Sequence, residues 1–433
     1  MTDRDYPKIV VPPPGPKARA IVERDAAWTS HCYIKEYPLA IARGEGVMVE
    51  DIDGNRYLDF MAGIAVASTG YGHPHVVKAI QDAAANFLHI CGSDFYYEGM
   101  ATLCERLAKV APGPTKKRVF LTNSGTEAVE GAIKLARYAT RRTAMIAFKG
   151  AFHGRSTGAV SLTSSKARQH AGFGPLLPDV HHVDYAYRYR CRHCADRPAC
   201  SLGCVTSIED DLFARHLDPH DVAAIFVEPI QGEGGVRVID PHFLRGLRAL
   251  TRERNVLLIL DEIQCGLGRT GSFFAYEQLG LEPDILTLAK PLAGGLPMGA
   301  ILVTDAVAKA IQAGDHGTTF GGGPLLSHVA HHVVQRLADP AMLKHVRETG
   351  AWFGTQLHAI AERTGRVREI RGTGLMWGMD VHESASGVIA RAFDHGLLLV
   401  SAGEHTLRFL PPLVISRDEL SAGLEILEHA IMG

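Results

Sequence analysis

The feature that most constrains the fold is an alternation of helical patterns with short, continuously apolar runs, which extends from about residue 75 to residue 325. The runs VAAIFV at 222–227 and VLLIL at 256–260 contain no polar residue, as expected for strands buried on both faces of a parallel sheet. Helical patterns such as GTEAVEGAIKLARYAT at 125–140 separate such runs. We therefore predict an α/β fold with a mostly parallel central sheet covered by helices on both faces.

The pattern of predicted elements changes after about residue 325, where two long helical patterns precede shorter, strand-like segments. We predict a large domain at 66–325 and a smaller α+β domain at 326–433. The first ~20 residues contain PPPGP, which cannot lie inside a helix or a central strand. Residues 1–65 are therefore predicted to form an extended arm and a segment that packs on the small domain.

Charge and hydropathy exclude several classes of protein. The 433 residues include 45 Lys and Arg against 47 Asp and Glu, so the basic excess typical of a nucleic-acid-binding protein is missing. No apolar run approaches the ~18 residues needed to cross a bilayer, and MTDRDYPKIV at the start lacks the apolar core of a secretory signal. We expect a cytoplasmic protein without membrane or nucleic-acid partners, whose eight cysteines are reduced thiols or metal ligands.

One apolar run leads into a candidate phosphate site. Ser124, Gly125 and Thr126 follow the strand-like RVFLT and begin a helix, whose free N–H groups and positive dipole end suit a phosphate. The same residues also fit a plain capping box made by Ser124 with Glu127, with no ligand at all.

Three other segments place a carboxylate or an amine where a predicted strand ends, at the edge where parallel sheets bind ligands. Glu228 and Glu233 follow the run at 222–227 and are either solvated loop residues or neighbours of a ligand. Asp261 is expected to be desolvated and needs a partner, either an arginine or a cationic cofactor nitrogen. Lys290 is either a surface lysine or an amine nucleophile with a lowered pKa. Jointly, the segments match the needs of pyridoxal 5′-phosphate, which requires a phosphate site, an acidic partner for its ring nitrogen and a Schiff-base lysine.

The sequence resembles the class-III pyridoxal-phosphate aminotransferases from about residue 38 to the C-terminus. The motifs that carry the resemblance are NSGTEAVEGAIKLAR, FKGAFHGRSTGAVSLT, FVEPIQGEGG, LILDEIQCGLGRTG, DILTLAKPLAGGLPMGA, HGTTFGGGP and LRFLPPLVI. The subgroup that they resemble contains the 4-aminobutyrate and the acetylornithine and ornithine aminotransferases. The resemblance implies fold type I, the cofactor pyridoxal 5′-phosphate and a homodimer with shared active sites.

The resemblance also implies roles around the cofactor. Lys290 is similar to the lysine that forms the Schiff base, Asp261 to the carboxylate on the pyridine nitrogen, and Gln264 to the residue near the phenolic oxygen. The other residues that it assigns to the cofactor are Ser124, Gly125, Thr126, Phe152, His153, Glu228, Ile263 and Thr319.

For three of these residues, the resemblance also implies a position relative to the cofactor. Phe152 is similar to the aromatic residue that stacks on the cofactor ring, and Ile263 would lie on the opposite face. Thr319, in HGTTFGG, resembles the threonine that reaches the phosphate from the neighbouring subunit.

Four residues bear on the substrate. By resemblance, Arg155 holds a distal carboxylate, Arg408 binds an α-carboxylate, and Glu233 pairs with Arg408 when no α-carboxylate is present; bidentate pairing explains the use of arginine. Ile64 stands where ornithine-specific relatives tend to have tyrosine, which favours a substrate like 4-aminobutyrate.

We therefore predict an aminotransferase that moves an amino group from an ω-amino acid such as 4-aminobutyrate to 2-oxoglutarate by a ping-pong mechanism, with Lys290 as the proton carrier. The alternatives are an ornithine- or acetylornithine-type aminotransferase and a pyridoxal-phosphate amino-acid racemase. A further alternative is a non-catalytic protein that binds a metal or a partner.

A cysteine cluster stands apart from these motifs. Cys191, Cys194, Cys200 and Cys204 lie in an insertion predicted at 188–206. Four thiolates so close in sequence suit a structural zinc ion or an iron–sulfur cluster, although the spacing is not that of a zinc ribbon. The alternative is a loop of reduced thiols, or one in which the thiols oxidise in pairs.

Overall fold

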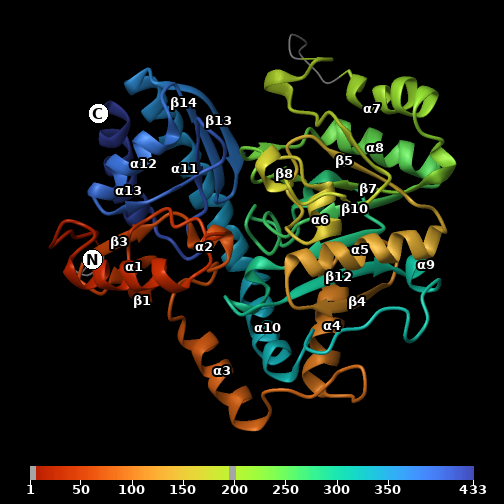
Figure 1. Cartoon of the computed structure of the whole chain (residues 1–433), viewed down its shortest axis with the longest axis horizontal. Helices are drawn as coiled ribbons and strands as arrows, with labels where there is room; N and C mark the ends of the chain where they lie inside the picture. Colours follow the sequence, from red (N-terminus) through yellow and green to blue (C-terminus); the bar gives the residue numbers. More distant parts are fainter. Residues whose placement is uncertain (1–5, 195–200) are drawn as a thin grey trace. The chain divides into compact units, whose positions relative to one another are not determined.

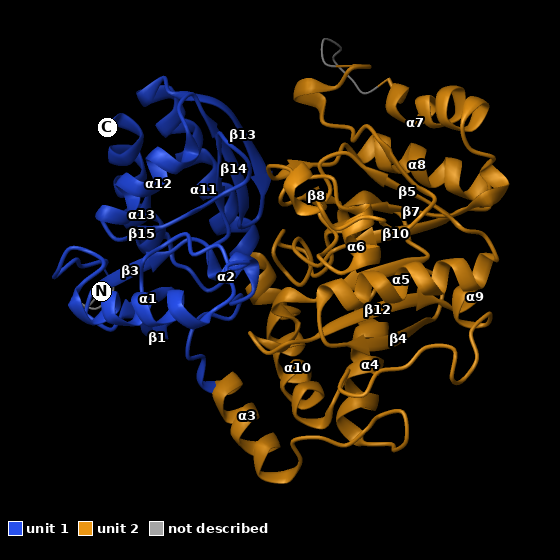
Figure 2. Ribbon diagram, in the orientation of Figure 1, with its two compact units in different colours: residues 1–74, 345–433 blue, residues 75–344 orange. Residues whose placement is uncertain are grey.

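The computed structural model describes residues 6–194 and 201–433, which divide into two compact units (Figure 2). Unit 1 consists of residues 1–74 together with 345–433, and unit 2 consists of residues 75–344. Among the described residues, every helix is too short or too polar to cross a membrane.

Unit 2 is built on a seven-stranded sheet with the order β4-β12-β11-β10-β7-β5-β6 (Figure 1). The strands β6, β5, β7, β10 and β11 run parallel to one another, whereas β12 is antiparallel to both β11 and β4. The sheet is therefore mostly parallel, which confirms the predicted fold class. The strands are β4 (Lys117–Thr122), β5 (Ala144–Phe148), β6 (Val180–Val183), β7 (Val222–Val227), β10 (Leu257–Asp261), β11 (Ile285–Leu288) and β12 (Gly299–Thr304).

Helix α5 shows why this unit has its core where it does. Its small residues Ala128 and Val129 are fully buried in one apolar cluster with Phe226, Ile259 and Ile285 of the sheet, so short side chains let the helix lie close to the strands. The main helices of unit 2 are α3 (Pro74–Asn86), α4 (Glu98–Val110), α5 (Gly125–Thr140), α6 (Thr157–Leu162), α8 (Pro241–Glu253) and α10 (Pro324–Leu337).

Unit 1 contains two four-stranded sheets, with the orders β1-β2-β3-β15 and β13-β14-β17-β16. Leu58 of β3 is in parallel register with Leu397 of β15, so an N-terminal strand and a C-terminal strand share one sheet. The strands are β1 (Ile41–Glu45), β2 (Met48–Asp51), β3 (Arg56–Asp59), β13 (Val367–Thr373), β14 (Met376–Val381), β15 (Leu397–Leu398), β16 (Val400–Ser401) and β17 (Thr406–Phe409). The helices are α1 (Pro16–Trp28), α2 (Ala62–Ala65), α11 (Pro340–Thr364), α12 (Ala385–Asp394) and α13 (Arg417–Met432).

The N-terminal segment is less extended than its proline content predicts. Helix α1 begins at Pro16, because proline has the right φ for the first helical position and needs no hydrogen-bond acceptor there. The carboxylate of Asp53 accepts the N–H groups of Lys17 and Ala18 at 2.9 and 2.8 Å. A carboxylate 35 residues away thus caps this helix, and no local pattern announces such a cap.

Candidate active site

The centre of the candidate site is a buried pair formed by Asp261 and His153. Asp261 ends β10, and its Oδ2 atom lies 2.7 Å from Nδ1 of His153; the two side chains are 3% and 0% exposed. The other carboxylate oxygen accepts the N–H of Ile263 at 3.0 Å. Burial alone lowers the pKa of His153, but the hydrogen bond to Asp261 and the charge of that carboxylate outweigh burial and raise it. The partner of Asp261 within unit 2 is therefore a histidine.

A second buried carboxylate, Glu228, joins two loops of the site. It accepts the N–H of Phe152 at 3.1 Å and the N–H of Gly232 at 3.4 Å. Burial raises the pKa of Glu228 to about 7; nearby Asp261 adds to the rise, and His153 opposes it. Glu228 thus fixes the backbone that carries the predicted stacking ring of Phe152.

The start of α5, the end of β10 and the end of β11 meet at Gly125. A Cβ atom added to Gly125 would lie 3.0 Å from Cδ1 of Ile263 and 3.4 Å from Cβ of Ala289, so a larger residue would crowd both neighbours. Lys290 comes directly after Ala289, at the start of the short helix η6 (Lys290–Ala293), and is half-buried. The structure therefore brings together the backbone segments that carry the predicted phosphate site, the predicted acid and the predicted amine.

The predicted capping role of Ser124 is present as well. Its Oγ atom accepts the N–H of Glu127 at 3.3 Å, and the Glu127 carboxylate accepts the N–H of Asn123 at 2.9 Å. The hydroxyl of Thr126 lies 2.6 Å from that of Ser156. A cap satisfies only part of the first turn of a helix, so this arrangement leaves the phosphate prediction in place.

The loops near this centre carry two more predicted residues. The guanidinium of Arg155 lies 5.7 Å from the ring centroid of Phe152, which is within cation–π range. The carboxylate of Glu233 lies 3.9 Å from Nζ of Lys166. Lys166 was not predicted from the sequence, because no motif links it to a carboxylate 67 positions later. Gln264 packs against Gly232, where a Cβ atom would meet its side-chain amide.

Thr319 differs from its neighbour Thr318 in what it contacts. The Thr318 hydroxyl accepts a hydrogen bond from the side-chain amide of Asn123 at 3.3 Å, beside the start of α5. Thr319 is exposed. Sequence reasoning missed Asn123 and Thr318, since their contact joins segments 195 residues apart.

Two predicted substrate residues, Ile64 and Arg408, belong to unit 1. Ile64 lies in α2 with φ of 63°, which is an unfavourable backbone conformation for a β-branched residue. Arg408 lies on β17, is 1% exposed and stands opposite Gly378 of β14.

The predicted cysteine cluster is only partly inside the described chain. Cys191, Cys194 and Cys204 are buried, and Sγ of Cys191 lies 3.1 Å from Sγ of Cys204. Cys200 lies outside the described residues. Within residues 6–194 and 201–433, no group of three or more His, Cys, Asp or Glu side chains is arranged to hold a metal ion. The metal site stays a prediction.

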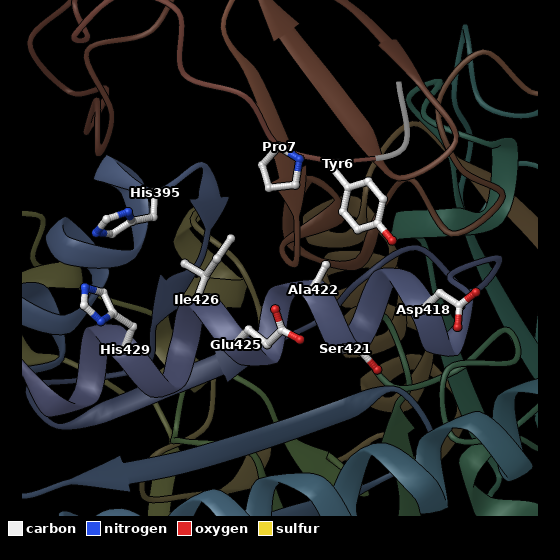
Figure 3. Close-up of a pocket in the computed structure, with 9 residues that line it drawn as sticks. All are labelled: Tyr6, Pro7, His395, Asp418, Ser421, Ala422, Glu425, Ile426 and His429. Carbon is white, nitrogen blue, oxygen red and sulfur yellow. The ribbon is translucent and has the colours of Figure 1, made fainter. Parts of the chain in front are cut away.

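Unit 1 also contains a pocket of about 610 Å³ that no sequence motif predicted (Figure 3). Tyr6 and Pro7 face helix α13 across it, which lines the pocket from Asp418 to His429, and His395 at the end of α12 also lines it. The predicted catalytic and binding residues are absent from the residues that line this pocket.

Known proteins resemble this chain over most of its length. A family model for class-III aminotransferases matches residues 32–431. The acetylornithine aminotransferase of Caldanaerobacter subterraneus subsp. tengcongensis is 38% identical over 91% of this chain and 95% of its own length. The alanine/serine racemase of Pyrococcus horikoshii is 34% identical over 99% of this chain and 93% of its own length. The crystal structure of ornithine aminotransferase from Toxoplasma gondii ME49 superimposes with a TM-score of 0.85 at 32% identity, covering 96% of this chain and 95% of that one.

Proposed function

Since the chain belongs to the class-III aminotransferases, a family of pyridoxal-phosphate enzymes, we propose that it transfers an amino group from an ornithine-type amino acid to a keto acid. The names of its relatives, which include acetylornithine and ornithine aminotransferases, support this donor class. The relatives therefore support the ornithine or acetylornithine alternative better than the donor first predicted from the sequence, 4-aminobutyrate. That first prediction depended on Ile64.

The observation that carries the proposal is the meeting of three segments at Gly125, beside the buried pair of Asp261 and His153. A Cβ atom on Gly125 would crowd Ile263 and Ala289, so glycine lets the start of α5 come close to the other two segments. The buried Nε2 of His153 has no hydrogen-bond partner among the described residues. The start of a helix and a buried carboxylate beside it fit a cofactor that is anionic at one end and cationic at its ring nitrogen. When bound, pyridoxal phosphate supplies an aldehyde that joins to amines and a ring that accepts electrons.

The residues of unit 2 would divide the work as follows. The start of α5 would hold the phosphate with its backbone N–H groups, and Asp261 would favour the protonated form of the ring nitrogen. Phe152 and Ile263 would pack against the ring. The amine of Lys290 would hold the cofactor and would move a proton at the substrate carbon, as a general base and then a general acid. The hydrogen bond with His153 would hold the Asp261 carboxylate in one orientation.

Two arginines would hold the carboxylates of the substrate, because a planar guanidinium makes two parallel hydrogen bonds to such a group. By the family resemblance, Arg408 would bind an α-carboxylate and Arg155 a distal one. The role of Glu233 stays a prediction; within unit 2 its carboxylate lies 3.9 Å from Nζ of Lys166.

Amino-donor specificity tests the proposal directly. N-acetylornithine, ornithine and 4-aminobutyrate are each offered with 2-oxoglutarate, and glutamate formation is measured. We expect the highest kcat/KM with N-acetylornithine or ornithine. A higher value with 4-aminobutyrate would overturn the proposed donor class and restore the donor inferred from Ile64.

A racemase is the second candidate, because the relative from Pyrococcus horikoshii aligns with 99% of this chain. Both reactions use the same proton carrier and differ in where the proton is returned. An aminotransferase consumes one keto acid per turnover, whereas a racemase needs none. Inversion of L-alanine or L-serine without any keto acid, at a rate comparable to glutamate formation, would favour the racemase.

We also propose that the enzyme is a homodimer in which Thr319 reaches the partner's site. Exposed apolar side chains support this: Phe87, Leu88, Phe95, Tyr96 and Phe320 are 57–106% exposed. The rings of His89 and Phe320 lie 4.9 Å apart, so Phe320, next to Thr319, is close to the segment that carries Phe87 and Leu88. Large exposed apolar side chains are typical of association surfaces.

The molar mass in solution, from light scattering during gel filtration, tests the dimer. We expect twice the chain mass of 46.9 kDa and a shift toward one chain mass in Tyr96→Asp combined with Phe320→Asp. A fully active enzyme with the mass of one chain would contradict the shared site.

A further inference from the structure

The turn that carries Ile64 has a backbone conformation that its own residues disfavour. Residues 62–65 have φ angles of 49°, 61°, 63° and 64°, so four consecutive residues are left-handed. Only Gly63 among them lacks a Cβ atom. A left-handed conformation brings Cβ too close to the following carbonyl oxygen, so the other three residues, including the β-branched Ile64, are strained. Such a conformation persists only where the surrounding structure holds it in place.

Asp59, the last residue of β3, holds the start of this turn. Its Oδ1 atom accepts the N–H of Met61 at 2.7 Å, and its Oδ2 atom accepts the N–H of Ala62 at 3.0 Å. Asp59 is 3% exposed, so these hydrogen bonds lie in a low-dielectric interior that strengthens them. The N–H groups of Val66 and Ala67 both donate to the carbonyl of Ala62 at 2.8 Å and close the turn. One carboxylate thus fixes the residue to which the end of the turn is hydrogen-bonded.

Tyr71 in turn holds the carboxylate of Asp59. Its hydroxyl lies 2.6 Å from Oδ2 of Asp59. Burial and the charge of Asp59 raise the pKa of Tyr71, so the hydroxyl keeps its proton and donates. The backbone N–H of Tyr71 donates to the carbonyl of Gly46 at 2.8 Å, and a Cβ atom on Gly44 of β1 would lie 2.7 Å from the Tyr71 ring. The hairpin of β1 and β2 therefore anchors Tyr71, which orients Asp59, which holds the turn.

We propose that Asp59 and Tyr71 are positioning residues that set amino-donor selectivity by holding Ile64 in one place. The inference rests on the proposed aminotransferase function and on the family resemblance, which assigns Ile64 to the substrate. Both residues act through the turn and not by touching the donor. Without the Tyr71 hydroxyl, the Asp59 carboxylate is free to rotate, and the turn relaxes toward backbone angles that its residues prefer. Displacement of a substrate-binding group by 1 Å can change a rate by roughly 10²-fold.

Tyr71→Phe removes only the hydroxyl and is the principal test. Tyr57→Phe is the matched control, because the Tyr57 hydroxyl lies 3.4 Å from Oδ2 of Asp51, another buried aspartate of unit 1. With 2-oxoglutarate as acceptor, kcat/KM is measured for N-acetylornithine and for 4-aminobutyrate, and the ratio of the two values is compared between variants. We expect this ratio to change by at least ~5-fold in Tyr71→Phe and in Asp59→Asn, and to stay within about twofold in Tyr57→Phe. The ratio does not depend on how much of the protein is active, so partial unfolding leaves it unchanged.

Hydrogen exchange in the cofactor-free protein gives a readout that needs no turnover. Exchange of the amides at 61–67 should become at least ~10-fold faster in Tyr71→Phe and stay unchanged in Tyr57→Phe, because only the first variant frees the turn to open locally. Faster exchange with an unchanged donor ratio would show a purely structural role and would overturn the proposal. An equal change of the ratio in Tyr57→Phe would overturn it as well. A parent enzyme that prefers 4-aminobutyrate would contradict the proposed donor class and leave this comparison of variants intact.

Discussion

Two groups of buried acidic side chains, one in each unit, have opposite kinds of partner. In unit 1, the guanidinium of Arg371 lies 2.8 Å from Glu369 and 2.8 Å from Asp380, and Asp380 also accepts the hydroxyl of Thr406 at 2.5 Å. The three charged side chains are only 9–13% exposed. Each acid of this network therefore has a permanent cation as its partner.

In unit 2, Glu228, Asp261 and Glu262 are buried without a lysine or arginine partner among the described residues. Backbone N–H groups and His153 are their partners instead; Glu262, for example, accepts the N–H groups of Ala275 and Tyr276 at 2.7 Å each. Burial raises the pKa of Glu228 to about 7 and that of Glu262 to about 8. The raised pKa values show that Glu228 and Glu262 hold a negative charge unfavourably where they are buried.

The difference separates a structural network from a candidate site. The ion pairs of unit 1 are complete, so removing one partner should cost stability and little else. The acidic cluster of unit 2 is unfavourable by itself and becomes favourable beside a cation such as a protonated ring nitrogen. Such preorganised charge is the usual source of electrostatic catalysis. Four substitutions sharpen this comparison.

The largest effect is expected for Lys290→Ala. Loss of the amine removes both the attachment of the cofactor and the proton carrier, so turnover should fall by at least ~10⁴-fold. Glutamate formation measures the loss, and an unchanged circular dichroism spectrum shows that the fold is intact. Turnover within tenfold of the parent enzyme would show that Lys290 is not the reactive amine.

Asp261→Asn should lower kcat by roughly 10²–10³-fold, the typical result of removing one preorganised electrostatic group. The neutral amide no longer holds a proton on the ring nitrogen. Asp380→Asn in unit 1 is the matched control and should leave kcat within a few-fold. Equal losses of kcat in the two variants would show that the buried acids of the two units do not differ in their role in catalysis.

Arg371→Met should destabilise the protein by about 3–5 kcal/mol, because breaking a buried ion pair leaves uncompensated charge. Equilibrium unfolding in urea measures the loss. The cofactor absorbance of the folded variant should be unchanged. A loss of less than 1 kcal/mol in the free energy of unfolding would mean that other groups compensate the charges of Glu369 and Asp380.

Glu228→Gln should change how stability depends on pH in the cofactor-free protein. A carboxyl whose pKa is raised on folding stabilises the folded state below its unfolded pKa, and that contribution is lost as pH rises toward about 7. The parent protein should therefore lose up to about 3 kcal/mol between pH 4.5 and 7 from this group. The variant should have a flatter profile across that window, and identical slopes would show that Glu228 ionises normally.

The sequence predicted well what depends on local pattern. The helix predicted over 125–140 matches α5, and the polar residues Asp261 and Lys290 stand where predicted strands end. It did not predict that His153 is the partner of Asp261, because 108 residues separate them and the pairing depends on the order of strands in the sheet. The antiparallel placement of β12 was missed for the same reason. The positive φ at Ile64 was also missed, since no glycine or asparagine stands there to suggest it.

The most direct test of the central claim is the position of the amine that binds the cofactor. The purified protein is incubated with pyridoxal 5′-phosphate and reduced with borohydride, which fixes any Schiff base as a stable secondary amine, and its peptides are mapped by mass spectrometry. We predict a single modified residue, Lys290, and no modification in Lys290→Ala. Modification of a different lysine such as Lys166, or of none, would contradict the account.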